Sequence, residues 1–265
     1  MKTLRIYQCE ESVDGIFSAI YEAGISGYGH EYIRIMPLNK EQSFEMELFS
    51  EYIQVESSEK KVRSVLKAVR EKISYEAYNY IMRAAVSSEP DKADVIYQFV
   101  TYGFTIGSKV TQAMQLDCVR RIFVINRNVN NEINRFVEIM RFKEVQKNPT
   151  LLLGVMEPKH RILPMVTEHF ADRFNPEWFI IYDITHHEAS FHNPDGRWEI
   201  RLLTDEEELK LTELNKKEEE YSGLWKIFFD TIAVKERKNH ECQRNMIPIH
   251  LRKHMIEFAN VRSSD

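Results

Sequence analysis

The segment that most constrains the fold is a turn sequence, Asn193–Gly196, between two short apolar stretches. Apolar residues alternate with polar ones on both sides, with Ala189 and Phe191 before the turn and Trp198 and Ile200 after it. Such alternation is typical of half-buried strands, and Asn-Pro-Asp-Gly is typical of a tight hairpin turn. The segment therefore predicts a β-hairpin of two antiparallel strands.

Other segments predict further strands and helices. Strands are expected at residues 4–9, 51–56, 151–157 and 178–183, whereas the glycines and proline within 24–39 predict mostly loop. Good helix-capping residues stand at Ser12, Ser57 or Ser58, Ser74, and Asp91 or Asp94. Further helices are expected after Pro158, over the charged segment from Asp205, and from Pro248.

The segment 118–146 has apolar residues at helical spacing, among them Ile125, Val129 and Phe136. Its many asparagines predict a break into two helical pieces. Together these elements predict an α+β fold, with helices packed around a small antiparallel sheet. A length of 265 residues fits a single domain, with a possible subdivision into an N-terminal part, 1–110, and a motif-bearing part, 111–265.

Composition limits the classes of function. No stretch approaches the roughly 20 apolar residues that span a bilayer, and the N-terminus lacks the pattern of a secretory signal. Cys9, Cys118 and Cys242 are far apart, which is typical of free thiols in a reducing cytoplasm and provides no iron–sulfur spacing. We therefore expect a cytoplasmic protein without a membrane partner.

Metal and cofactor sites have weak support in the sequence. His250 and His254 are four residues apart, and Asp183, His186 and His187 form a second loose group, but closed metal sites need three or four well-spaced ligands. Neither a nucleophile elbow, a phosphate-binding glycine loop nor a dinucleotide fingerprint is present. The sequence predicts no metal and no cofactor.

Three local basic patches stand out in a chain with a net charge of -5. In a helix, Arg127, Asn131, Asn134 and Arg141 would share one polar face, and Arg and Asn are suitable donors to phosphates and base edges. The segment 158–161 is expected at the start of a helix, whose unpaired N–H groups favour an anion. The third patch is 236–254. Ordinary solvated helix faces are the alternative explanation for each.

Several motifs resemble a known family. They are EINRFVEIMRF (132–142), MEPKHRILPMVTEHFADRF (156–174) and LWKIFFDTIAVKERKN with the later proline (224–248), and YQCEESVDGIFSAIYEA (7–23) resembles the family's start. In this order they are similar to bacterial DNA-metabolism proteins that are encoded beside a radical-SAM protein of DNA modification or repair. A related domain is fused elsewhere to a uracil-DNA-glycosylase-type domain.

The resemblance carries over to particular residues. The matching positions are Glu132, Arg135, Arg141, Phe142, Pro158, His160, Pro164, Phe170, Arg173, Trp225, Arg237 and Pro248. Asn134 departs from the family, because many relatives have a histidine there. The candidate residues for binding nucleic acid or another anion are Arg135, His160, Arg237, Lys159, Arg161, Arg127 and Asn134.

Two functions remain open. The resemblance implies an accessory protein that binds DNA beside a radical-SAM partner, whose cofactor would supply the chemistry. The alternative is a stand-alone enzyme acting on a nucleobase or glycosidic bond, with Glu132, His160, His169, Asp183 and Arg237 as acid, base and charge clamp. We expect Arg135, His160 and Arg237 to share a polar cleft, and Arg141 to serve the fold.

Overall fold

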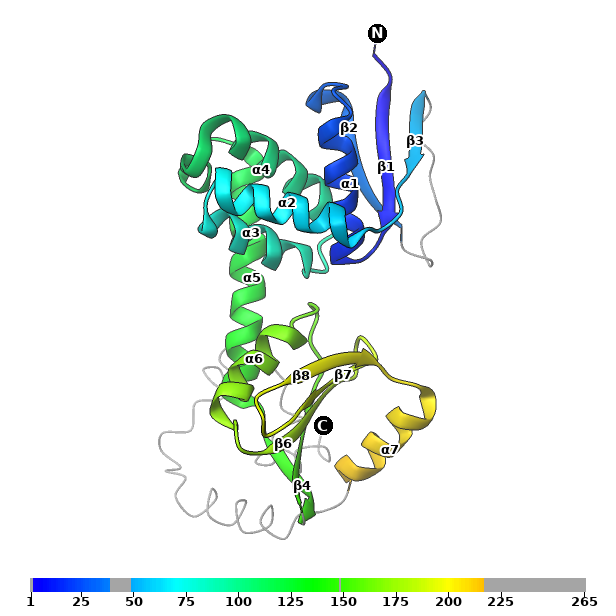
Figure 1. Ribbon diagram of the computed structural model, residues 1–265, viewed down its shortest axis with the longest axis vertical. Coiled ribbons are helices and arrows are strands. Elements are labelled where there is room, and N and C mark those ends of the chain that lie inside the picture. Colours follow the sequence, from blue (N-terminus) through cyan, green and yellow to red (C-terminus); the bar gives the residue numbers. More distant parts are fainter. Residues whose placement is uncertain (1, 39–48, 148, 217–265) are drawn as a thin grey trace, which may run out of the picture. The chain divides into compact units, whose positions relative to one another are not determined.

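The computed structural model describes residues 2–38, 49–147 and 149–216 (Figure 1). The chain groups into two compact units, unit 1 (Met1–Asn131) and unit 2 (Glu132–Asp265), whereas the sequence suggested a possible division after residue 110. Helix α5 (Asp117–Ile139) contains the boundary. Within the described ranges, no helix is long and apolar enough to cross a membrane.

The sheet of unit 1 has three strands, β1 (Leu4–Glu10), β2 (Ile33–Leu38) and β3 (Ser50–Gln54), in the order β2-β1-β3. Both strand pairs are parallel. Helix α1 (Val13–Ile25) connects β1 to β2, and a helical crossover of this kind returns the chain in the same direction. The expectation of mostly loop over 24–39 was wrong, because the segment contains β2.

Four helices pack in unit 1 beside its sheet: α1, α2 (Glu59–Lys72), α3 (Tyr75–Ala85) and α4 (Lys92–Ile106). Short 3-10 turns lie at η1 (His30–Tyr32) and η2 (Gly107–Gln112). The Ser12 and Ser74 hydroxyls accept hydrogen bonds from Gly15 N and Ala77 N, both at 3.0 Å, which confirms these two predicted helix starts. Phe17, Tyr97 and Phe99 are among the largest fully buried side chains.

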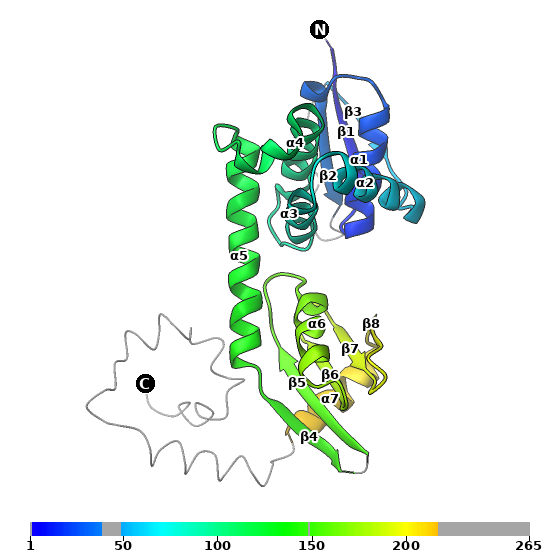
Figure 2. The same cartoon turned by 60° about the vertical axis from the view of Figure 1, so that its left-hand side comes forward.

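Helix α5 is a single continuous helix (Figure 2), so the predicted break at its asparagines was wrong. Its apolar stripe is buried along the helix, at Ile122, Ile125, Val129 and Phe136. Asn126 is buried too, and its amide nitrogen donates to the carbonyls of Tyr80 and Ile122, both at 2.9 Å. Packing of the stripe therefore outweighs the low helix propensity of asparagine.

The sheet of unit 2 has five strands in the order β4-β5-β6-β7-β8. The strands are β4 (Phe142–Lys147), β5 (Thr150–Met156), β6 (Trp178–Asp183), β7 (Glu188–His192) and β8 (Trp198–Leu202). Strands β5 and β6 are parallel and are joined through α6 (Leu163–Arg173), while the other neighbours are antiparallel. The predicted hairpin is confirmed as β7–β8, and α7 (Asp205–Lys216) follows it.

The predicted small antiparallel sheet was therefore wrong in kind. The described chain is a mixed α/β protein with one parallel three-stranded sheet and one mixed five-stranded sheet. The physical reason is the pair of helical crossovers, through α1 and through α6, each of which forces its two flanking strands to run parallel.

An aromatic cluster in unit 2 explains several residues of the resemblance. The Phe142 ring meets Phe170 and Phe174 edge to face, with centroids 4.9 Å and 5.2 Å apart. Gly154 on β5 leaves room for this ring, since a Cβ there would lie 3.0 Å from Phe142 Cε1. Phe142 and Phe170 thus serve the core, and Pro164 lies in the first turn of α6.

Candidate functional site

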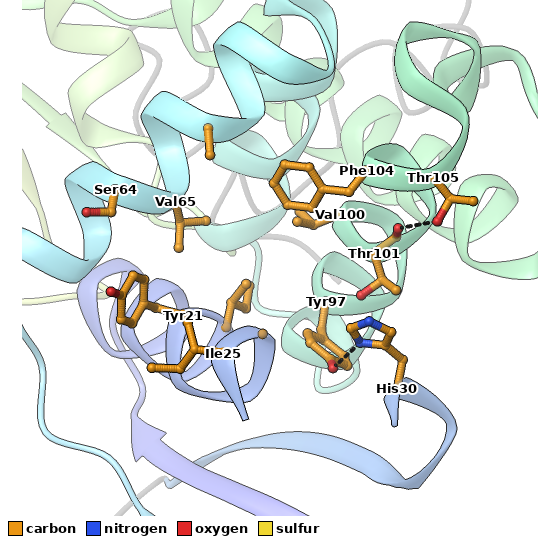
Figure 3. Close-up of a pocket in the computed structure, with 13 residues that line it drawn as sticks. Tyr21, Ile25, His30, Ser64, Val65, Tyr97, Val100, Thr101, Phe104 and Thr105 are labelled. Carbon is orange, nitrogen blue, oxygen red and sulfur yellow. Dashed lines mark hydrogen bonds between the residues drawn. The ribbon is translucent and has the colours of Figure 1, made fainter. Parts of the chain in front are cut away.

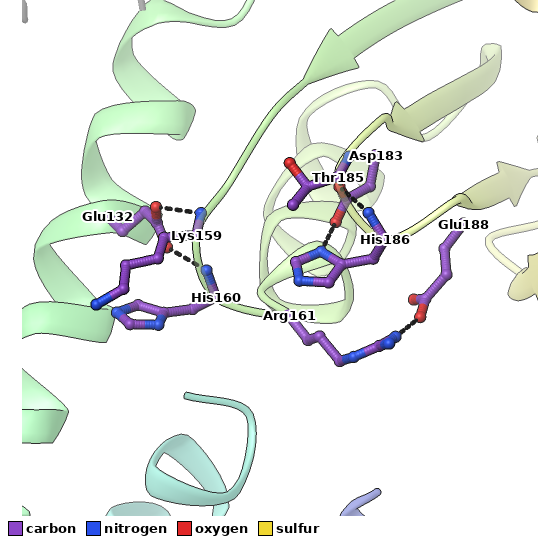
Figure 4. A network of polar contacts seen from close by, with 8 residues as sticks. All are labelled: Glu132, Lys159, His160, Arg161, Asp183, Thr185, His186 and Glu188. Atoms are coloured by element: carbon purple, nitrogen blue, oxygen red, sulfur yellow. Dashed lines mark hydrogen bonds and ion pairs between the residues drawn. The ribbon is translucent and has the colours of Figure 1, made fainter. Parts of the chain in front are cut away.

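A network of polar groups in unit 2 lies where the parallel strands β5 and β6 end (Figure 4). Met156 and Asp183 are partners in the last register position, and Ile184 N donates to Met156 O at 3.0 Å. The segments that follow the two strands therefore leave the sheet at the same edge. The carboxyl edge of parallel strands is where open α/β sheets commonly bind ligands.

The segment after β5 is held by Glu132 of α5. One carboxylate oxygen of Glu132 accepts from Lys159 N at 2.7 Å and the other from His160 N at 2.9 Å. The prediction that 158–161 begins a helix was wrong, because α6 starts at Leu163. Glu132 itself occupies the anion position expected at these N–H groups, so this backbone does not offer them to a phosphate.

His160 and Lys159 differ in exposure. His160 is buried and Lys159 is exposed, and both make further contacts besides those with Glu132. The His160 side chain is therefore shielded from solvent. Lys159 is the one of the two whose charge faces solvent.

The segment after β6 holds a histidine through a buried carboxylate. Asp183 is 0% exposed, and one of its oxygens accepts from Thr185 N at 3.0 Å and His186 N at 3.2 Å. The other oxygen lies 2.7 Å from His186 Nδ1. A carboxylate at Nδ1 fixes the ring orientation and makes Nε2 the nitrogen available for proton transfer. Among the described residues, Nε2 has no hydrogen-bond partner.

Arg161 and Glu188 form an ion pair beside this histidine (Figure 4). Burial raises the pKa of Glu188, and the charge of Arg161 opposes part of that rise. Half of the Arg161 side chain remains exposed. The edge of the sheet thus combines an oriented imidazole with a partly exposed guanidinium.

The loose group of Asp183, His186 and His187 separates into two pairs. His187 turns away to Glu208, with 2.6 Å between Nδ1 and the carboxylate oxygen. Among the residues considered for an enzyme, Glu132 is bound to the backbone of Lys159 and His160, and His169 is exposed on α6, edge-on to Phe170. His186, rather than these residues, is the partner of Asp183.

The arginines of α5 fall into two classes. Arg120 is paired with Asp117, and Arg121 binds Asp91 and Glu89. Arg127 and Arg135 are exposed, and neither forms an ion pair with any residue that the structure describes. The α5 polar face, which we define as Arg127, Asn131, Asn134 and Arg135, falls within an arc of about 100° at 3.6 residues per turn.

The sequence suggested that Arg141 shares this face. It does not, because α5 ends at Ile139. Its guanidinium instead donates to the carbonyls of Glu138, Ile139 and Met140 at 3.1–3.3 Å. A cation at the carbonyl end of a helix stabilises the helix, which agrees with the structural role expected for Arg141.

Arg237, Cys242, His250 and His254 lie outside the described residues, as does the whole basic segment 236–254. The predicted cleft of Arg135, His160 and Arg237 therefore stays a prediction. Of its members, the structure places Arg135 exposed on α5 and His160 buried at the Glu132 turn.

A weak signal for the Asp183–His186 pair is present in the sequence. A polar Asp at the end of an otherwise apolar strand, followed three residues later by His, is the pattern that builds it. Its proximity to the segment after β5 could not be read from the sequence, because it depends on β5 and β6 being parallel.

No curated protein matches this chain at a significant level. A solved pGpG-specific phosphodiesterase from Vibrio cholerae overlaps 80% of this chain and 98% of its own at 9% identity, with a TM-score of 0.33, which is too low to show a shared fold.

A family profile, described as a domain of unknown function, DUF4130, matches residues 90–257. That range covers well over half of the chain and contains the three motifs between 132 and 248, whereas the similar segment 7–23 lies before it. The chain therefore belongs to the DUF4130 family, a family associated with uracil-DNA glycosylases.

Proposed function

We propose that this chain is a DNA-metabolism protein that binds nucleic acid through the α5 polar face. The observation that carries the proposal is the contrast among the arginines of α5. Arg120 and Arg121 are neutralised by nearby carboxylates, whereas Arg127 and Arg135 expose guanidinium groups without an acidic partner among the described residues. Association of the family with uracil-DNA glycosylases supports DNA as the partner.

The chemistry of this face suits a phosphate backbone. A guanidinium is permanently charged and donates two parallel hydrogen bonds to phosphate oxygens. Asn131 and Asn134 add neutral donors and acceptors between the two arginines, which can bond to sugar, phosphate or base edges. Asn134 can hydrogen-bond in place of the histidine of many relatives but cannot donate a proton.

The proposed role is accessory. The chain would hold or present DNA while a radical-SAM protein encoded nearby carries out the modification or repair reaction with its own cofactor. Co-purification of the two proteins, with and without DNA, tests the partnership. A radical-SAM protein that passes through the column unretained in both cases would contradict it.

Binding itself is tested with the full chain and fluorescently labelled single-stranded, duplex and lesion-bearing DNA. We expect binding at low salt and a linear fall of log K with log salt concentration, because phosphate contacts release counterions. Absence of binding to all three forms at low salt would contradict the proposal.

A second candidate function rests on the Asp183–His186 pair. A histidine oriented by a buried carboxylate is a suitable general base, and a partly exposed cation, Arg161, lies at the same sheet edge. In hydrolysis of a glycosidic bond, His186 Nε2 would take a proton from a water molecule while the oxygen of that water attacks C1′. The C1′–N bond would then break, and the base would leave with the bonding electrons.

This candidate is separable from DNA binding by experiment. Uracil-containing and alkylated DNA are incubated with the protein alone, and released base is measured. His186→Ala should abolish base release while leaving DNA binding intact. His187→Ala, the adjacent control, should still release the base. No release by the wild-type protein, with DNA binding preserved, would eliminate the enzyme function and leave the accessory one.

A further inference from the structure

A pocket of about 390 Å³ lies in unit 1, among α1, α2, α4 and η1 (Figure 3). Its size falls within the range of small-molecule sites, which is roughly 300–1,000 Å³. Most of its lining residues precede the region matched by the DUF4130 profile. The pocket is therefore distinct from both the α5 polar face and the Asp183–His186 pair.

The middle of the pocket is apolar. Ile20, Val65 and Val100 line it, together with Ile25 and Phe104, which are 63% and 48% exposed. Gly24 also lines the pocket, and a Cβ added there would meet no atom within 4 Å. Two large apolar side chains thus stand exposed beside open space that a flat apolar molecule could fill.

One end of the pocket carries a histidine that is hydrogen-bonded to a tyrosine. The Tyr97 hydroxyl lies 2.7 Å from His30 Nδ1. Burial raises the pKa of Tyr97 to about 12, so the phenol stays protonated and can donate to Nδ1. A neutral imidazole that accepts at Nδ1 carries its own proton on Nε2. His30 is exposed, so this Nε2–H is available to a ligand.

Acceptor oxygens lie elsewhere on the lining. The Ser64 hydroxyl donates to Lys60 O at 2.8 Å, and the Thr105 hydroxyl donates to Thr101 O at 3.2 Å. Because each hydroxyl has spent its proton, its oxygen is left as an acceptor. In Figure 3, Ser64 lies across the pocket from His30. Polar groups thus flank an apolar middle.

The lining includes no Asp, Glu, Lys or Arg among the residues that the structure describes. A charged ligand would lose its hydration here without gaining a counter-charge. A neutral ring suits this lining better. Its apolar faces would contact the apolar middle of the pocket, and acceptors and donors on its edge would bond to His30 and the hydroxyls.

We infer that this pocket binds a neutral heteroaromatic ring of the nucleobase type, with a ring acceptor on His30 Nε2–H and a ring donor on the Ser64 hydroxyl oxygen across the pocket. The inference stands on the lining of unit 1 and does not depend on DNA binding by α5. A base reaching the pocket could be free, part of a nucleoside, or part of a strand.

Ligand-detected NMR and calorimetry on the full chain test this, with adenine, guanine, cytosine and uracil as free bases and as nucleosides. We expect saturable binding of at least one base. A nucleoside that binds as well as its base would indicate that the sugar stays outside. Binding of benzene or indole with no binding of any base or nucleoside would overturn the inference.

Two variants locate the ligand. Gly24→Leu places a side chain in the open space and should reduce affinity at least 10-fold, whereas Asn128→Leu, on an exposed position of α5, should leave affinity unchanged. Tyr97→Phe removes the hydroxyl that fixes His30 and should weaken binding about 3-fold to 10-fold. Circular dichroism shows whether the Gly24→Leu variant is folded. A folded variant that binds the ligand as tightly as the wild type would overturn the inference.

Discussion

The carboxylate of Glu132 accepts the backbone N–H of His160 at 2.9 Å, and with its other oxygen it accepts the preceding N–H, of Lys159. Both oxygens of one side chain on α5 therefore satisfy two backbone donors of the segment that follows β5. Hydrogen bonds to a charged acceptor are stronger than neutral ones. This contact sets the conformation of the turn that carries Lys159 and Arg161.

Glu132→Gln should destabilise unit 2. An amide offers only one acceptor oxygen, so one of the two backbone N–H groups would face an NH₂ group. We expect a loss of about 1–3 kcal/mol in the free energy of unfolding, measured by urea titration. Glu138→Gln, an exposed position on the same helix, should change it by less than about 0.5 kcal/mol. Equal effects of the two substitutions would contradict the role of Glu132.

Two glycines of α1 should respond oppositely to alanine. A Cβ at Gly15 would lie 2.3 Å from Glu10 O, a backbone atom that cannot move aside, so Gly15→Ala should destabilise by about 1–3 kcal/mol. Gly24→Ala meets no atom within 4 Å and should stabilise by up to about 1 kcal/mol, because alanine favours helix. Thermal unfolding of both variants measures this, and a stable Gly15→Ala protein would show that the approach of α1 to β1 is incorrect.

The Asp91–Arg121 pair should make stability depend on pH. Hydrogen bonds from Arg121 lower the pKa of Asp91, against the opposing effect of burial. A carboxylate whose folded pKa is lowered stabilises above its unfolded pKa, near 3.8, and this contribution is lost as the pH falls through the folded value. Because the Asp91 side chain is 43% exposed, solvent screening limits the contribution to about 1 kcal/mol.

Asp91→Asn removes the titrating group and keeps a residue suited to the helix cap. The stability difference between wild type and variant should be constant from pH 7 to pH 5 and shrink below pH 4, as measured by urea unfolding. Asp117→Asn, at a side chain that is 91% exposed in its pair with Arg120, should show almost no difference at any pH. A stability difference between wild type and Asp91→Asn that grows as the pH falls would contradict the stabilising role of the Asp91–Arg121 pair.

The local elements of the fold were largely predictable, and the sheets were not. Ser12 and Ser74 identified helix starts, and the turn at 193–196 identified the hairpin, because each depends on nearby residues. Strand direction depends on which distant strands pair. The hairpin suggested antiparallel pairing throughout, whereas the strand–helix–strand order around α1 and α6 was the signal for parallel pairs.

The candidate site was predictable only in its parts. Basic residues on α5 and around 158–161 are visible in the sequence, but their pairing is not: Arg121 is neutralised by residues thirty positions away, and Glu132 occupies the expected anion position. The partner of Asp183 was also missed, because the geometry of the turn, rather than spacing, selects His186 over His187.

The most direct test of the central claim compares two double variants in DNA binding by fluorescence anisotropy across a series of salt concentrations. Arg127→Ala/Arg135→Ala removes the two arginines of the α5 polar face. Arg63→Ala/Arg197→Ala removes two exposed arginines, one in each unit, which are paired with Glu59 and Asp195. Because each double variant loses two arginines, the change in net charge is the same. We predict that the first variant binds at least 10-fold more weakly and that its salt slope falls by about 2, while the second matches the wild type. Equal affinities and equal slopes for the two double variants would contradict the claim that the α5 polar face binds DNA.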